Sequence, residues 1–142
     1  MKKILFLCTG NSCRSQIAEG LANDIFDSSY NIESAGTEKH GVNPYAIKTL
    51  KEIGINISDY KSKTINLDEL NRFDLVITLC GDAKDKCPIL DKGVKHIHWD
   101  LKDPAKFKGT DLEIMFHFGN TRDLILNNIK ELKINLEKGN LK

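Results

Sequence analysis

Residues 75–79, Leu-Val-Ile-Thr-Leu, form the continuous apolar run that most restricts the fold of this chain. An uninterrupted run of aliphatic and β-branched residues is typical of a strand covered on both faces in a parallel sheet. Residues 3–7 form a second such run, and Ile17, Leu21 and Ile25 follow it at helical spacing. A strand followed by a helix is the unit from which parallel α/β sheets are built.

Two more strands and two more helices are predicted further along. Residues 31–36 and 94–98 indicate short strands. Asn43-Pro44 places a capping residue before a helix-opening proline, and Gly54 is expected to end that helix. Its predicted apolar face comprises Ala46, Ile47, Leu50 and Ile53.

Residues 111–136 predict a long final helix that Gly119-Asn120 interrupts or bends. Its predicted inward positions are Leu112, Met115, Leu124, Ile129, Leu132 and Leu136. The elements together predict a single α/β domain over residues 1–142. We expect a four-stranded parallel sheet flanked by helices, with ligands bound at the carboxyl ends of its strands.

Composition excludes several kinds of partner. The net charge of +1 gives no overall field that would favour nucleic acid or an anionic membrane. Only residues 4–7 are apolar before the first cysteine, which is too short for a secretion signal, and no run approaches the roughly 20 apolar residues of a membrane span. We therefore expect a cytoplasmic monomer, whose four cysteines serve catalysis or metal binding rather than a disulfide framework.

A candidate anion-binding loop lies between the first predicted strand and the first predicted helix. In that position backbone N–H groups and a helix N-terminus converge on an anion. Its residues are Cys8, Thr9, Gly10, Asn11, Ser12, Cys13, Arg14 and Ser15. The alternative is a buried cysteine at a strand end, followed by an ordinary capped helix.

Four residues of this loop have expected roles. Gly10 permits a turn that residues with a Cβ resist, and Arg14 offers a planar fork of donors to a tetrahedral oxyanion. Cys8 would be the nucleophile, as a thiolate stabilised by the surrounding donors. Ser15 would donate a hydrogen bond to that thiolate while capping the helix.

Cys80 and Cys87 lie seven positions apart in a polar segment that directly follows the buried run at 75–79. Three alternatives to a redox role are a zinc site, inert thiols and a structural disulfide. Zinc usually takes closely spaced ligand pairs, which these two cysteines and the scattered histidines do not supply, so we expect no metal. A permanent disulfide is disfavoured in a reducing cytosol.

The loop at Cys8–Ser15 resembles the phosphate-binding loop of low-molecular-weight protein tyrosine phosphatases and of the arsenate reductases that share their fold. The segment from Thr78 to Cys87 resembles the redox segment of the thioredoxin-coupled arsenate reductases. So do residues 41–44, Gly-Val-Asn-Pro, and His98-Trp99 leading to Asp103-Pro104. The resemblance covers essentially the whole chain.

The resemblance implies reduction of arsenate to arsenite, as arsenic detoxification, without a bound cofactor. Cys8 would attack arsenate held by Arg14 and the loop amides, with Asp103, or alternatively Asp100, as the acid. Cys80 would then form a transient Cys8–Cys80 disulfide, and Cys87 would convert it to a Cys80–Cys87 disulfide that reduced thioredoxin opens. Cys13 has no electron-transfer role in this scheme and is expected to pack.

Two rival functions stay open. One is a tyrosine phosphatase in which Cys80 and Cys87 only protect Cys8 from oxidation. The other is a non-catalytic oxyanion binder or thiol-based sensor.

Some relatives bind potassium beside the loop. The matching residues here are Asn11, Glu19 and Ser34, but Lys63 stands where an acidic residue is expected. A lysine ammonium can replace the cation, or Lys63 can simply point to solvent, as most lysines do. We expect the protein to be independent of potassium.

Overall fold

A parallel four-stranded sheet forms the centre of the computed structural model, which describes residues 2–87 and 90–139. The strands are β1 (Lys2–Cys8), β2 (Tyr30–Gly36), β3 (Leu75–Thr78) and β4 (Lys95–His98), in the order β2-β1-β3-β4. Every pairing between neighbouring strands is parallel. The predicted sheet is therefore confirmed in strand number and direction.

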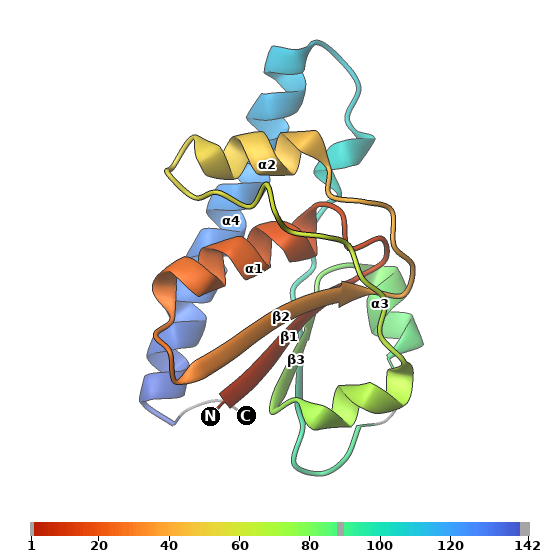
Figure 1. Ribbon diagram of the computed structural model, residues 1–142, viewed down its shortest axis with the longest axis vertical. Helices are drawn as coiled ribbons and strands as arrows, with labels where there is room; N and C mark the ends of the chain where they lie inside the picture. The colour runs from red at the N-terminus through yellow and green to blue at the C-terminus, as the bar shows by residue number, and fades with distance from the viewer. Residues whose placement is uncertain (1, 88–89, 140–142) are drawn as a thin grey trace.

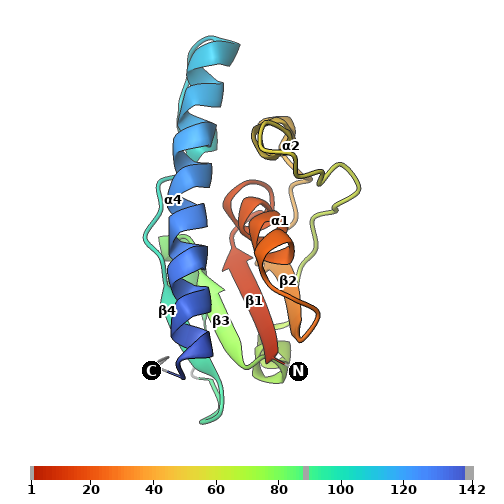
Figure 2. The same cartoon turned by 90° about the vertical axis from the view of Figure 1, so that its left-hand side faces the viewer.

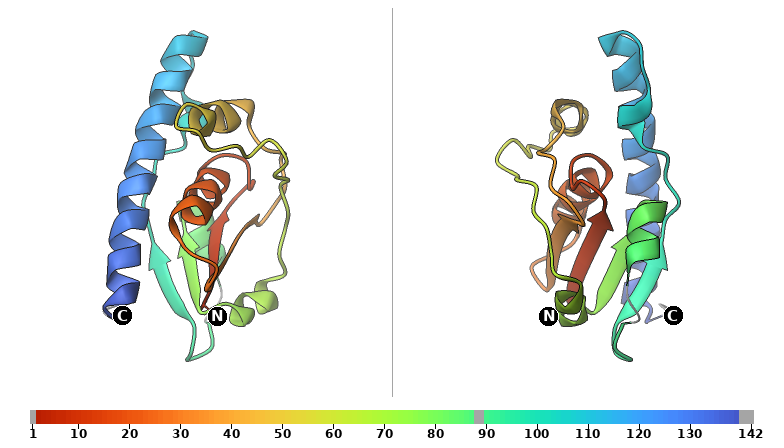
Figure 3. Two further views of the ribbon diagram at one scale, coloured as in Figure 1. Left: turned by 60° about the vertical axis from the view of Figure 1, so that its left-hand side comes forward. Right: turned by 90° about the vertical axis from the view of Figure 1, so that its right-hand side faces the viewer.

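Helices cover both faces of this sheet (Figure 1). The α-helices are α1 (Arg14–Ile25), α2 (Pro44–Lys51), α3 (Gly81–Lys86) and α4 (Asp111–Glu137), with two 3-10 helices, η1 (Leu67–Arg72) and η2 (Pro104–Lys106). α1 and α4 pack together on one face, and α3 lies on the other side of the sheet (Figures 1 and 3). None of the helices within the described ranges is long and apolar enough to cross a membrane.

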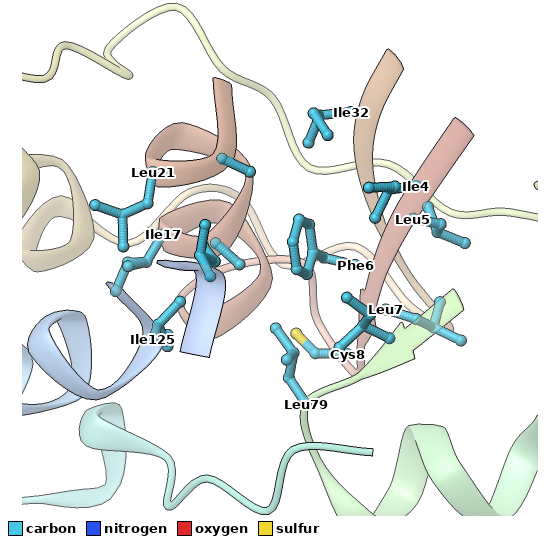
Figure 4. Packing of buried hydrophobic residues seen from close by; sticks show 14 of the residues in the cluster. Ile4, Leu5, Phe6, Leu7, Cys8, Ile17, Leu21, Ile32, Leu79 and Ile125 are labelled. Carbon is cyan, nitrogen blue, oxygen red and sulfur yellow. The ribbon is translucent and has the colours of Figure 1, made fainter. Parts of the chain in front are cut away.

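The core centres on β1, because this strand is paired on both edges and covered on both faces. Ile4, Leu5, Phe6 and Leu7 are each no more than 1% exposed. Figure 4 shows Phe6 on the side of β1 where Ile17 and Ile125 lie, which are supplied by α1 and α4. Burying a side chain of this size contributes about 1.5–3 kcal/mol, so the strand that ends at Cys8 is firmly held.

The predicted inward face of α4 is partly wrong. Leu112 and Leu124 are 84% and 57% exposed, and the buried positions are Phe118, Thr121, Ile125, Ile129 and Leu132. The first turns of α4 extend beyond the carboxyl ends of the strands (Figure 2), so Leu112 has no sheet to cover. The helix also runs unbroken through Gly119-Asn120, because a helical glycine costs only about 1 kcal/mol, less than the buried apolar side chains contribute.

The predicted start of α2 is confirmed, but its apolar face is shorter than expected. The Asn43 side chain accepts a hydrogen bond from the Tyr45 backbone N–H at 2.8 Å, which caps the helix. The helix ends at Lys51, and Gly54 adopts a φ of +82° in the turn that follows. Ile53 lies in this turn and is 42% exposed, so it does not belong to the buried face.

Residues 36–43 run alongside the loop after β1 and are joined to it by backbone hydrogen bonds. The N–H groups of Thr37, Glu38 and His40 donate to the carbonyls of Cys8, Thr9 and Gly10, at 3.2, 2.8 and 2.9 Å. Gly36 lies where these two segments meet. A Cβ added to Gly36 would be 2.4 Å from the Glu38 carbonyl oxygen and 2.5 Å from that of Thr9.

We predict that Gly36→Ala lowers the free energy of unfolding by about 1–3 kcal/mol, because the obstructing atoms are backbone atoms that no side-chain rotation can move. Gly93→Ala is the matched control, since a Cβ there meets nothing within 4 Å, and its effect should stay within about 0.5 kcal/mol. Urea denaturation measures both. Equal stability of the two variants would contradict the close approach at Gly36.

Candidate active site

Cys8 ends β1 inside a network of hydroxyl and amide groups. Its thiol is 3% exposed, and its sulfur lies 3.1 Å from the Ser15 hydroxyl. The Asn11 side-chain amide donates to the same Ser15 oxygen at 2.9 Å. Because that oxygen accepts from Asn11, the hydroxyl proton of Ser15 is free to point at the sulfur, where it stabilises a thiolate.

Two details of the loop differ from the sequence prediction. The residue at the N-cap of α1 is Cys13, and it makes no side-chain capping bond. Ser15 lies inside the helix, where Cys8 and Asn11 engage its hydroxyl.

A Cβ is disfavoured at Gly10, as predicted, but for a different reason than a backbone turn. The loop residue with positive φ is Asn11, at 49°, a region that asparagine tolerates better than most residues. The His40 ring packs over Gly10, so a larger residue there would displace the ring. A Cβ on Gly10 would be 2.3 Å from His40 Nδ1.

Arg14 reaches from the first turn of α1 to two other segments. Its Nη1 donates to the carbonyls of Leu101 and Leu79 at 2.9 and 3.4 Å, and its Nη2 lies 3.7 Å from Asp103 Oδ2. Its Nε is buried and has no hydrogen-bond partner among the described residues. An unsatisfied buried donor is costly, so an anion bound here would satisfy it.

Asp103 lines the same cavity of about 290 Å³ as Cys8 and Arg14. It caps η2, where its Oδ1 accepts a hydrogen bond from the Ala105 N–H at 3.0 Å. The side chain is thereby held at the mouth of the loop. Asp100, the alternative acid, is exposed and lines a different cavity, with Phe107 and His117.

Cys80 lies two residues after the end of β3 and is 6% exposed. Its sulfur lies 3.2 Å from the Thr9 hydroxyl, and the Ala83 N–H donates to it at 3.4 Å. It also lines a second cavity, of about 460 Å³, to which Thr9, Arg14 and Asp103 contribute. The structure therefore brings Cys80 to the edge of the loop that contains Cys8.

Cys87 is not brought together with the other thiols. It follows α3 and is half-buried, and this burial raises the pKa of its thiol. The six helical residues of α3 separate it from Cys80. At a rise of 1.5 Å per residue the two Cα atoms are about 10 Å apart, beyond the span of a disulfide. All four cysteines are free thiols.

Cys13 lies in the loop as a buried thiol. Burial first and the nearby Asp103 carboxylate second raise its pKa to about 12. A thiol with so high a pKa is a poor nucleophile near neutrality, which agrees with the expected packing role.

The residues that match a potassium site lie together. Ser34 Oγ donates to Glu19 Oε1 at 2.6 Å and accepts from the Asn11 side-chain amide at 2.9 Å. The Lys63 N–H donates to Asn11 Oδ1, while its ammonium pairs with Glu33 at 2.9 Å. Burial raises the pKa of Glu19, an effect opposed by the Ser34 hydrogen bond and the charge of Lys63. The described part of the chain has no cluster of three or more His, Cys, Asp or Glu residues suited to a metal ion.

Sequence reasoning missed three residues at this site. Gln16 donates to the Asn11 side-chain and backbone oxygens, Glu33 pairs with Lys63, and His40 lines the cavity with Cys8. Gln16 and Glu33 lie on a helix and a strand whose patterns carry no sign of such contacts. For His40, the only sequence feature that could have pointed to the site is the capping residue Asn43, three positions later.

Comparisons with known proteins agree on one family. The sequence model of the family described as "Low molecular weight phosphotyrosine protein phosphatase" matches residues 3–141 of this chain. An arsenate reductase from Bacillus subtilis is 52% identical over 130 residues, which cover 92% of this chain and 94% of the relative. The similarity thus extends over nearly the whole chain.

Solved structures give the same result. A solved structure of an arsenate reductase in the phosphate binding state has a TM-score of 0.71 at 33% identity, and the match covers 93% of this chain and 96% of that one. A thioredoxin-dependent arsenate reductase from Corynebacterium glutamicum has a TM-score of 0.68 at 29% identity, covering 92% of this chain and 62% of its own. The chain therefore belongs to the low-molecular-weight phosphotyrosine protein phosphatase family.

Proposed function

We propose that this protein reduces arsenate to arsenite with electrons from its own cysteines and, in turn, from thioredoxin. The observation that carries the proposal is the 3.2 Å contact between Cys80 Sγ and the Thr9 hydroxyl. It puts a second thiol beside an anion loop whose own thiol, Cys8, is the nucleophile. The name of the 52% identical Bacillus relative supports arsenate as the substrate.

The first step joins Cys8 to arsenic. Arsenate binds with its oxygens on the loop amides and on the unpartnered Arg14 Nε. The Cys8 thiolate attacks, so that an As–S bond forms while one As–O bond breaks. Asp103, which lines the same cavity, gives its proton to the departing oxygen, and this oxygen leaves as water. Arsenic is still arsenic(V) in this adduct.

Cys80 carries out the reduction in the second step. Its thiolate attacks Cys8 Sγ, so that an S–S bond forms and the As–S bond breaks. The electron pair of the broken bond stays on arsenic, which leaves as arsenite, arsenic(III). The Thr9 hydroxyl and the Ala83 N–H both lie within hydrogen-bonding distance of Cys80 Sγ, and they support its thiolate form.

Cys87 completes the relay. It attacks Cys80, which frees Cys8 and leaves a Cys80–Cys87 disulfide. Because α3 holds the two residues about 10 Å apart, at least part of this helix must unwind first. The unwound segment offers its disulfide to reduced thioredoxin, and the thioredoxin dependence of the Corynebacterium neighbour supports this choice of donor.

A phosphatase with protective cysteines is the second candidate, and the family match favours it as an alternative. The loop, Arg14 and Asp103 would serve phosphoryl transfer equally well. Against it, the cavity that contains Cys8 is lined by no phenylalanine, tyrosine or tryptophan among the described residues. The hydroxyl of Tyr45, the aromatic nearest to the capping Asn43, bonds to Asp111 instead.

We predict arsenate-dependent NADPH oxidation in the presence of thioredoxin and thioredoxin reductase, and its loss in Cys8→Ser, Cys80→Ser and Cys87→Ser. Each substitution removes one sulfur of the relay, so steady-state rates should fall by at least about a hundredfold, as for other essential catalytic groups. Cys13→Ser is the matched control and should keep most of the activity. Aryl phosphate hydrolysis that needs Cys8 alone, without arsenate-dependent oxidation, would establish the phosphatase instead.

We also propose that activity is independent of potassium. The Lys63 ammonium pairs with Glu33, and its positive charge also acts on Glu19, so it can take the place of a bound cation. Rates at equal ionic strength should therefore agree within about twofold in potassium and sodium chloride, and Lys63→Asp should introduce a preference for potassium. A severalfold activation of the unmodified protein by potassium would refute this.

A further inference from the structure

His40 lines the cavity that contains Cys8, Arg14 and Asp103, but the mechanism above gives it no task. Its side chain is 54% exposed, so it lies at the mouth of the cavity rather than in the core. A polar ring at this place would meet whatever part of a bound anion points away from Cys8.

Two contacts fix which edge of the ring faces the loop. The His40 backbone N–H donates to the Gly10 carbonyl at 2.9 Å. This hydrogen bond holds the residue beside the loop and does not depend on its side chain. Nδ1 is the ring atom nearest to the position of an added Cβ on Gly10, at 2.3 Å. The Nδ1 edge therefore faces the anion loop.

The opposite edge is held by a carboxylate. His40 Nε2 lies 3.0 Å from Glu38 Oε1. A carboxylate accepts but does not donate, so Nε2 carries a proton. Nδ1 is then an acceptor when the ring is neutral and a donor when the ring is charged. Glu38 is itself anchored, since its N–H donates to the Thr9 carbonyl at 2.8 Å.

We infer that His40 binds the outer oxygen of an inorganic tetrahedral oxyanion through Nδ1, and that Glu38 is the positioning residue that orients it. The inference rests on the proposed function and names a specificity determinant for it. An inorganic oxyanion at neutral pH has both hydroxyl and bare oxygens, so it can pair with Nδ1 in either protonation state. In an ester the outer oxygen bears a carbon group. This oxygen cannot make the same hydrogen bond to Nδ1, and the carbon group would lie against the His40 ring.

The charges around His40 suit such a ligand. Arg14 and Lys106 line the cavity with it and attract the anion, whereas Asp103 is the one carboxylate among the described residues that lines it. Glu38 lies behind the ring, on its Nε2 side. The histidine thus selects for a free outer oxygen, while Arg14 and the loop hold the remaining oxygens.

Titration of inorganic phosphate into the reduced full-length protein by calorimetry tests this directly. His40→Ala should weaken phosphate binding about tenfold, the effect of roughly one hydrogen bond. His40→Asn places an amide where Nδ1 lies and should stay within about threefold of the unmodified protein. Glu38→Gln should fall between the two. Lys39→Ala is the control, because this exposed neighbour lies outside the cavity lining and should bind phosphate normally.

Kinetics separate substrate binding from a merely structural role. His40→Ala should lower kcat/KM for arsenate about tenfold, whereas kcat/KM for p-nitrophenyl phosphate should not fall. Unchanged phosphate affinity in His40→Ala, equal losses in the alanine and asparagine variants, or an equal loss with the aryl ester would each overturn the inference. If the unmodified protein binds phosphate but does not reduce arsenate, the proposed function is wrong. The phosphate titrations then test on their own whether His40 binds the oxyanion.

Discussion

The parallel pairing of β1 with β3 is the constraint on which the site depends. Leu7 pairs with Thr78, so the two strands end at the same edge of the sheet, one leading into Cys8 and the other into Cys80. Both strands are buried in the centre of the sheet. Core packing therefore brings Cys80 to the edge of the loop that contains Cys8, although the two residues are far apart in sequence. The proposed relay between Cys8 and Cys80 starts from this arrangement.

The loop between β1 and α1 is rigid because its polar groups satisfy one another. Asn11 is fully buried and adopts positive φ. Its amide donates to Ser15 and Ser34, and its Oδ1 accepts from Gln16 and from the Lys63 backbone. Such a buried network holds one conformation strongly, although Gln16 Oε1 and Arg14 Nε have no hydrogen-bond partner among the described residues. The same network directs the Ser15 hydroxyl at Cys8 and leaves Arg14 Nε for a ligand. Cys87 lies outside this rigid part, across α3, where the proposed chemistry requires movement.

Most of the fold could be predicted from the sequence, because buried parallel strands and capped helices have local patterns. The run at 75–79 and the Asn43-Pro44 pair each specified an element that the structure contains. The inward face of α4 could not be predicted, because apolar residues lie on several sides of this helix. Which of them are buried depends on where the helix packs against the rest of the protein. The cysteines and Arg14 stand in a recognisable motif, and the structure gathers Cys8, Arg14, Cys80 and Asp103 around adjoining cavities. The reason for Gly10 and the place of His40 depend on contacts between residues about 30 positions apart, which no local pattern encodes.

The most direct test of the account is disulfide mapping after a single turnover. Reduced protein would be mixed with arsenate in the absence of thioredoxin, quenched with acid, alkylated and analysed by mass spectrometry, with the arsenite released measured in the same samples. The account predicts one arsenite per chain with a Cys80–Cys87 disulfide, and a Cys8–Cys80 disulfide in the Cys87→Ser variant. Four free thiols and no arsenite, or arsenite formed without either disulfide, would contradict it.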